Sequence, residues 1–132
     1  MSTDKALLRE WMDVLALGPA EAWQGRVADD VIVRLPFAPP GIAAEMRGIE
    51  QAIAMMASHW ESKERFDWCD VVIRATEDPG LFVITARSDV LFRSGLRYAN
   101  DYIVLTRLRG GLVVEHTEYF NPLPVLEMLK TA

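Results

Sequence analysis

Residues 81–120 read LFVITARSDVLFRSGLRYANDYIVLTRLRGGLVVEHTEYF, and this stretch decides the fold. Three runs rich in β-branched and aromatic residues are separated by Ser94-Gly95 and by Arg109-Gly110-Gly111, which are short glycine-containing turns of the kind that join antiparallel strands. A further apolar run at residues 66–75 comes before the turn signal Glu77-Asp78-Pro79-Gly80. We therefore predict an antiparallel sheet of four strands joined by hairpins.

Helical patterns dominate the chain before this sheet, because apolar side chains recur there at helical spacing. Residues 31–37 are expected to form one further strand, and the Pro- and Gly-rich residues 38–48 a loop. Helices followed by a run of antiparallel strands predict an α+β domain whose helices pack on one face of the sheet. The predicted helices cover residues 2–17, 19–24, 49–62 and 121–130.

Length and charge limit the classes of protein. The 132 residues suit one domain with a substantial core, so we assign residues 1–132 to a single domain. The net charge is −5, from 14 Lys and Arg against 19 Asp and Glu, and no basic stripe occurs, which disfavours nucleic acid as a partner. Charges in the first turns and the lack of a long apolar run indicate neither a signal peptide nor a membrane anchor, so we expect a cytoplasmic protein.

No cofactor or metal site is indicated. Two histidines without a short shared motif, together with the single Cys69, fall short of a metal-ligand set. No glycine-rich loop follows a strand in the way that nucleotide cofactors require. We therefore expect chemistry that depends on side chains alone.

The most informative residues for function are Arg87 and Asp89, which share one face of a strand because side chains alternate. If Ser94-Gly95 forms a two-residue turn, Asp89 lies opposite Asn100 and Arg87 opposite Tyr102. In this register the pair lines a pocket. The alternative is an exposed ion pair of little energetic value, since a slip of one residue moves a strand's side chains to the other face.

The last strand adds His116 and Glu118, which also share one face. A three-residue loop at residues 109–111 would put Tyr102 opposite Glu118 and Val104 opposite His116. Under these registers one face of the sheet carries a polar cluster with an apolar rim. The predicted cluster consists of Arg87, Asp89, Tyr98, Asn100, Tyr102, His116 and Glu118.

The helix predicted at residues 49–62 contributes further candidates. Its apolar stripe includes Met56 and Trp60, which we expect to line the core and the pocket. His59 lies at the edge of this stripe, where it is either a surface residue or a donor in the pocket.

The order of elements resembles the SnoaL-like branch of the nuclear transport factor 2-like superfamily. The resemblance rests on RLPFAPPG at residues 34–41, GIEQAI at 48–53 and YANDYIVLTRLRGGLVVEHTEYFNP at 98–122. It implies a cone-shaped, cystatin-like α+β barrel in which the helices pack against a curved antiparallel sheet. Members include ketosteroid isomerase, limonene epoxide hydrolase, polyketide cyclases and the phenazine biosynthesis A/B proteins.

Two motifs are similar to those of limonene epoxide hydrolase. RSDVL at residues 87–91 matches its Arg-x-Asp, and TEYF at 117–120 matches its second carboxylate, with Glu in place of Asp. The resemblance implies that Asp89 is the acid, Arg87 an electrostatic bridge and Glu118 the base.

These observations predict a cofactor-free acid/base enzyme that acts on a small, largely apolar or polycyclic molecule. Isomerisation, cyclisation and epoxide opening all remain open. In this hypothesis several further residues bind the substrate. They are the polar Tyr98, Asn100, Tyr102 and His116 of the strands, and Met56, His59 and Trp60 of the helix. The competing hypothesis is a non-catalytic ligand-binding or dimeric assembly domain of the same fold.

A homodimer is also expected. Four apolar residues are predicted to face away from the pocket and would leave an exposed apolar sheet surface in a monomer. These residues are Ile103, Leu105, Val113 and Tyr119.

Overall fold

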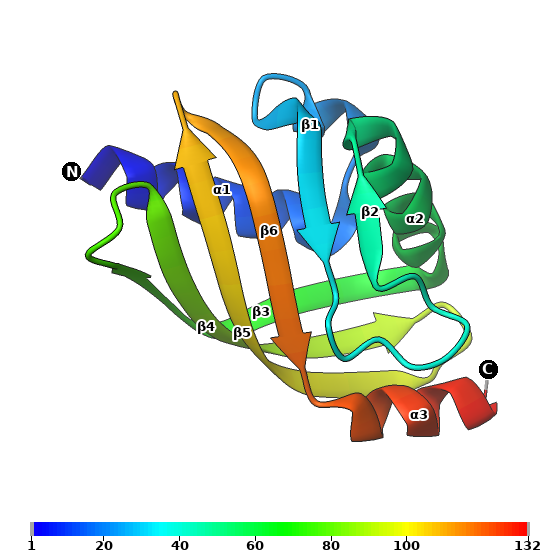
Figure 1. The fold of residues 1–132 in the computed structure, drawn as a ribbon. Helices are drawn as coiled ribbons and strands as arrows, with labels where there is room; N and C mark the ends of the chain where they lie inside the picture. Colours follow the sequence, from blue (N-terminus) through cyan, green and yellow to red (C-terminus); the bar gives the residue numbers. More distant parts are fainter. Residues whose placement is uncertain (1, 132) are drawn as a thin grey trace.

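The computed structural model describes residues 2–131 (Figure 1). The helix predicted at residues 49–62 and the strands predicted at 81–92 and 112–120 are confirmed with the same bounds. A short strand lies inside the segment predicted to be a loop, since Glu45–Arg47 pairs with the first strand. The elements are α1 (Ser2–Leu17), the 3-10 helix η1 (Ala20–Trp23), β1 (Val27–Arg34), β2 (Glu45–Arg47), α2 (Ile49–Ser62), β3 (Lys63–Ala75), β4 (Leu81–Phe92), β5 (Arg97–Arg109), β6 (Leu112–Phe120) and α3 (Pro122–Thr131).

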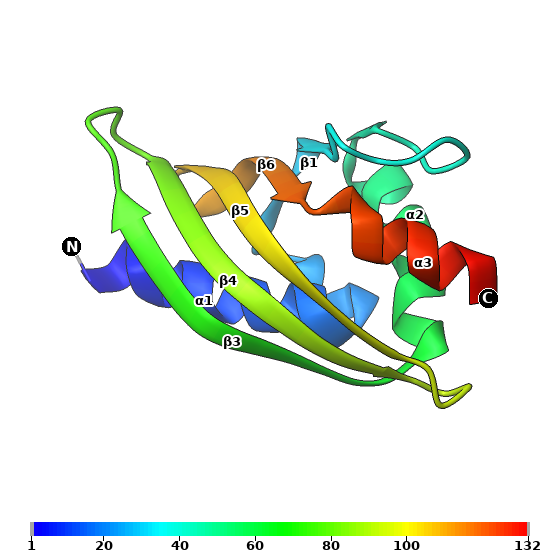
Figure 2. The ribbon, with the colours of Figure 1, turned by 90° about the horizontal axis from the view of Figure 1, so that it is seen from below.

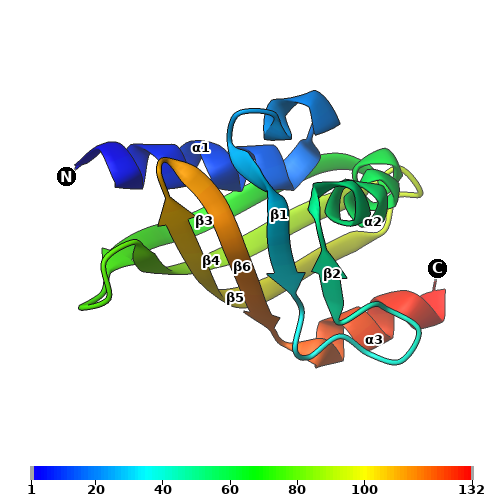
Figure 3. The same ribbon diagram turned by 45° about the horizontal axis from the view of Figure 1, so that its top comes forward.

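The six strands form one curved, open sheet in the order β2-β1-β6-β5-β4-β3. All neighbours are antiparallel except β1 and β6, which run parallel. The sheet curls around α1, while α2 and α3 lie near each other at one end (Figures 2 and 3). This arrangement confirms the predicted cone-shaped α+β fold.

No helix within residues 2–131 is long and apolar enough to cross a membrane.

Two bulges bend β3, the strand at the edge of the sheet. The pairing shifts between Cys69 and Val72, where Asp70 has a positive φ of 55°. It also shifts near the start of the strand, so that Lys63 pairs with Phe92. An extra residue in a strand bends it and turns the preceding side chain to the other face. The inner face of β3 therefore begins with a lysine.

The β4–β5 hairpin differs from the predicted register by one residue. Ser88 lies opposite Asn100, and Arg87 lies opposite Asp101. The cause is the turn, in which the Phe92 N–H donates to the Leu96 carbonyl and encloses three residues instead of two. The third of these is Gly95, whose φ of 91° suits the left-handed position of a three-residue hairpin loop. Every side chain of β4 is consequently on the face opposite to the one predicted.

The β5–β6 hairpin is shifted by two residues and therefore keeps the predicted face. Thr106 lies opposite His116 and Val104 opposite Glu118. The turn is a two-residue Gly110-Gly111 connection with positive φ at both positions, and an irregularity follows at Arg107 and Leu108.

The core fills the space between α1 and the inner face of the sheet. Trp11 and Trp23 are its largest fully buried side chains, with ring centroids 4.9 Å apart. Val113 belongs to this core and is 2% exposed, so its predicted place on the outer face is wrong. Ile103 is 51% exposed on the outer face, opposite Tyr119.

Candidate active site

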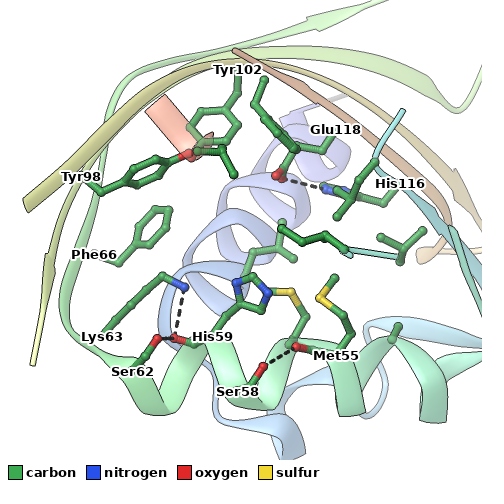
Figure 4. A pocket seen from close by; sticks show the side chains of 18 of the residues that line it. Met55, Ser58, His59, Ser62, Lys63, Phe66, Tyr98, Tyr102, His116 and Glu118 are labelled. Carbon is green, nitrogen blue, oxygen red and sulfur yellow. Dashed lines mark hydrogen bonds and ion pairs between the residues drawn. The ribbon is translucent and has the colours of Figure 1, made fainter. Parts of the chain in front are cut away.

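A cavity of about 300 Å³ lies between the inner face of the sheet, α2 and α3 (Figure 4). Its size falls at the lower end of the range for small-molecule pockets. Apolar side chains make most of the wall, among them Trp68, Phe120 and Met56. The polar residues of the wall are Ser58, His59, Ser62, Lys63, Tyr98, Tyr102, His116 and Glu118.

Most of the predicted binding residues line this cavity. Tyr98, Tyr102, His116 and Glu118 come from β5 and β6, while His59 and Met56 come from α2. The alternation of β5 and β6 was sufficient to find the first four, because the shift of their hairpin is even.

Two predicted residues lie behind the wall. Asn100 donates through Nδ2 to the Tyr98 hydroxyl over 2.6 Å and to the Asn121 carbonyl over 2.8 Å. Its Oδ1 accepts from the Asn121 N–H over 3.0 Å, so Asn100 fixes the junction of β6 and α3. Trp60 packs against Trp23, with ring centroids 6.0 Å apart, and donates to the Leu15 carbonyl. Both residues support the cavity without lining it.

The prediction that Arg87 and Asp89 line the pocket is wrong. The Arg87 side chain is 63% exposed on the outer face, where it lies 3.1 Å from Asp70 and 3.7 Å from Asp101. Asp89 is 53% exposed and lies 3.6 Å from Arg65. The three-residue turn described above is the physical reason. Arg87 and Asp89 are thus in exposed ion pairs, as the alternative interpretation expected. Their match to the Arg-x-Asp motif of limonene epoxide hydrolase is one of sequence alone.

Glu118 is held by a chain of hydrogen bonds that begins in the core. Trp11 Nε1 donates to His116 Nδ1 over 3.1 Å, so in the neutral imidazole the proton lies on Nε2. That nitrogen faces Glu118 Oε1 at 3.4 Å, and the two side chains are 2% and 20% exposed, respectively. The histidine is thus oriented to donate to a carboxylate that still reaches the cavity.

Two phenols, from the buried Tyr102 and the half-buried Tyr98, line the cavity together with this carboxylate (Figure 4). Burial raises the pKa of Tyr98, and it raises the pKa of Tyr102 far above the ordinary value. The Tyr102 hydroxyl lies 3.1 Å from Ser88 Oγ, a residue that the observed register brings to the inner face. Both phenols therefore remain protonated and can donate hydrogen bonds.

Lys63 is the polar cavity residue next to His59 that the sequence analysis missed. It is 8% exposed, and its Nζ donates to the His59 carbonyl over 3.1 Å. Burial lowers the pKa of Lys63 to about 8 and the pKa of His59 to about 4, and Glu118 opposes both shifts. The apolar stripe of α2 gave no signal for Lys63, because the helix ends at Ser62 and Lys63 has extended backbone as the first residue of β3.

Within residues 2–131 no group of three His, Cys, Asp or Glu side chains is placed to hold a metal ion. Trp23 also lines the cavity, and its buried Nε1 finds no acceptor among the described residues. The wall thus combines one carboxylate with several hydrogen-bond donors.

Comparison with protein families agrees with this architecture. The family model of the SnoaL-like domain matches residues 8–116. An uncharacterised PhzA/B-like protein of Pseudomonas aeruginosa is 32% identical over 127 residues, which cover 95% of this chain and 89% of the relative.

Solved structures share the fold at low identity. A Bacillus subtilis protein superposes with a TM-score of 0.88 at 19% identity, over 99% of this chain and 95% of the other. The BvnE pinacolase of Penicillium brevicompactum superposes with a TM-score of 0.81 at 14% identity, over 98% and 93% of the two chains. These likenesses describe the fold alone.

Proposed function

The chain belongs to the SnoaL-like domain family, and on that premise we propose that it is an acid/base enzyme of the isomerase or cyclase type. The reaction would need no cofactor and would act on a small, largely apolar molecule held in the cavity. We assign Glu118 as the base.

One observation carries this proposal, namely a carboxylate in an apolar cavity that is oriented without being neutralised. His116 Nε2 lies 3.4 Å from Glu118 Oε1, and within residues 2–131 no lysine or arginine forms an ion pair with Glu118. A carboxylate that is buried beside a tight cationic partner is a poor proton acceptor, because the partner favours its charged form. Glu118 avoids this restriction and can take a proton from a bound molecule.

The acid of this proposal differs from the one predicted from the sequence. Asp89 lies outside the cavity, whereas the phenols of Tyr98 and Tyr102 line it. Their raised pKa values keep both protons in place, so the phenols can stabilise a developing oxyanion by hydrogen bonding. An isomerase or cyclase that enolises a carbonyl compound needs this combination of base and donors. The epoxide hydrolase hypothesis loses its acid, Asp89, and its electrostatic bridge, Arg87, and keeps only Glu118.

Exchange of carbon-bound protons in D₂O tests this proposal without knowledge of the natural substrate. Small ketones such as 2-tetralone and 2-acetylnaphthalene are incubated with the protein, and loss of the α-proton signal is followed by NMR. We expect the wild type to accelerate exchange and Glu118→Gln to reduce the acceleration by about 10²-fold or more.

Glu115→Gln is the matched control, because Glu115 lies on the same strand, is 42% exposed and faces Arg34 outside the cavity. It should exchange at the wild-type rate. If ketones bind to the wild type while their exchange equals that in buffer, the acid/base proposal is wrong, and a non-catalytic ligand-binding domain becomes the better description.

A further inference from the structure

Lys63 lies across the cavity from Glu118, on the floor formed by the end of α2 and the start of β3 (Figure 4). Its Nζ lies 6.0 Å from the ring centroid of Phe66 and 5.8 Å from that of Phe92. Its one hydrogen bond to a described residue goes to the His59 carbonyl. No carboxylate within residues 2–131 forms an ion pair with it, since Lys63 takes part in none of the salt bridges found there.

A buried ammonium group with one acceptor is costly to the fold. Desolvation disfavours the charged form, and an ammonium has three N–H donors to satisfy. An apolar side chain of similar size at residue 63 would pack against the same phenyl rings without this penalty. The lysine is therefore not explained by the stability of the fold. The two N–H donors of Nζ that do not bond the His59 carbonyl indicate an acceptor that a bound ligand supplies.

We propose that Lys63 binds the ligand oxygen on which negative charge develops when Glu118 removes a proton from carbon. Lys63 and Glu118 then form two opposite poles of the cavity. The ligand class that fits both poles is an apolar carbonyl compound with an acidic C–H bond, whose oxygen contacts Lys63 Nζ. This inference rests on the proposed function and names the substrate class of the same site.

The proton transfer balances within the cavity. The C–H bond breaks, its electron pair forms the carbon–carbon double bond of the enolate, and the carbonyl π pair moves to oxygen. The proton goes to Glu118, which becomes neutral, while the oxygen becomes negative beside the Lys63 ammonium. The net charge of the cavity does not change, so the step requires no oxidant and no ion from solution.

Two probes of matched shape test the inference through binding alone. They are 2-naphthoate, a permanent oxyanion at neutral pH, and 2-acetylnaphthalene, a neutral ketone of nearly the same size. We expect the wild type to favour the anion and Lys63→Met to weaken 2-naphthoate binding by about tenfold or more, as for loss of a charged hydrogen bond. Binding of 2-acetylnaphthalene should change far less.

Two further variants make the test specific. Lys130→Met removes an ammonium whose side chain is 71% exposed on α3, and it should leave both affinities unchanged. Glu118→Gln should strengthen 2-naphthoate binding, because it removes a negative charge from the cavity, whereas it should reduce the acceleration of proton exchange by about 10²-fold or more. A wild-type exchange rate in Glu118→Gln, combined with weak anion binding in Lys63→Met, would refute the base assignment and leave the Lys63 site intact.

The wild type alone provides a second measurement if Lys63→Met does not fold. The neighbouring His59 has a pKa of about 4, and the pKa values of Tyr98 and Tyr102 are raised, so Lys63 is the cavity group that loses charge near pH 8. Affinity for 2-naphthoate should fall above that pH, while affinity for the ketone stays level. Equal anion preference in Lys63→Met and the wild type, or a pH-independent preference in the wild type, would overturn the inference.

Discussion

Trp11 and His116 lie 105 positions apart in the chain and are joined by a hydrogen bond of 3.1 Å from the indole Nε1 to the imidazole Nδ1. The bond links the first helix to the last strand in the centre of the core. It also selects which imidazole nitrogen carries the proton, and so determines that His116 presents an N–H to Glu118.

We expect Trp11→Phe to lower the rate of ketone proton exchange several-fold, because His116 Nδ1 then loses its indole donor and keeps only the longer contact of 3.4 Å to Thr106 Oγ1. Ligand affinity should remain close to that of the wild type, since Trp11 does not line the cavity. NMR exchange rates and equilibrium binding measure the two effects separately. Trp60→Phe is the control, because Trp60 donates to the Leu15 carbonyl and has no link to Glu118. Equal loss of rate in both variants would mean that the effect is one of packing alone.

Asp89→Asn should change the free energy of unfolding by less than about 1 kcal/mol, as is usual for exposed ion pairs. Its carboxylate lies 3.6 Å from Arg65 and is 53% exposed. Arg87→Met should be similarly mild, and the double variant should be additive, because Arg87 pairs with Asp70 and Asp101 instead of Asp89. Chemical denaturation measures all three. A loss of 3 kcal/mol or more would indicate the buried pair of the original prediction.

Stability should fall as the pH is lowered from about 6.5 towards 4 through the titration of His59. Burial and the nearby Lys63 lower its pKa from 6.5 in the unfolded chain to about 4 in the folded one. The unfolded state therefore binds more protons in this window, and the folded state loses up to about 3 kcal/mol.

The measurement is the free energy of unfolding at a series of pH values. His59→Gln should remove this part of the pH dependence while keeping the acid sensitivity that arises from carboxylates. Identical slopes for the two proteins between pH 4 and 6.5 would show that His59 titrates as an ordinary surface residue.

We expect the protein to form a homodimer through the outer face of the sheet. Ile103 is 51% exposed there, next to the half-buried Leu105 and Tyr119, and exposed apolar surface of this kind favours association. Light scattering should give twice the chain mass, and Ile103→Lys should give the mass of one chain. Leu126→Lys places the same charge on α3, where Leu126 is 41% exposed, and should leave the dimer intact. A monomeric wild type at micromolar concentration would contradict this expectation.

The sequence was sufficient to predict most elements and one half of the site. The alternation in β5 and β6 found Tyr98, Tyr102, His116 and Glu118, because a hairpin shift of two residues keeps every side chain on its face. The same reasoning failed for Arg87 and Asp89, because Ser94-Gly95 fits a two-residue or a three-residue turn equally well and the choice reverses the face. The pairing of β1 with β6 joins distant segments, which no local pattern reveals.

Lys63 was missed for a related reason, since it reaches the cavity through a bulge. In the observed pairing Lys63 lies opposite Phe92 and Arg65 opposite Leu91, which leaves Glu64 as the extra residue. A regular ladder would place Glu64 opposite Phe92 and turn Lys63 outwards. The bulge thus determines whether the positive Lys63 or the negative Glu64 faces the cavity.

This arrangement has an evolutionary consequence. A mutation that straightens the start of β3 would put Glu64 in the place of Lys63 in the cavity wall without substituting either residue. The descendants of such an ancestor could turn from anionic to cationic ligands in one step, while their core, their sheet order and their other pocket residues stay the same. An alignment of such sequences would show almost no sign of this divergence. Lys63 and Glu64 would both be unchanged, and only the choice of which one faces the cavity would differ.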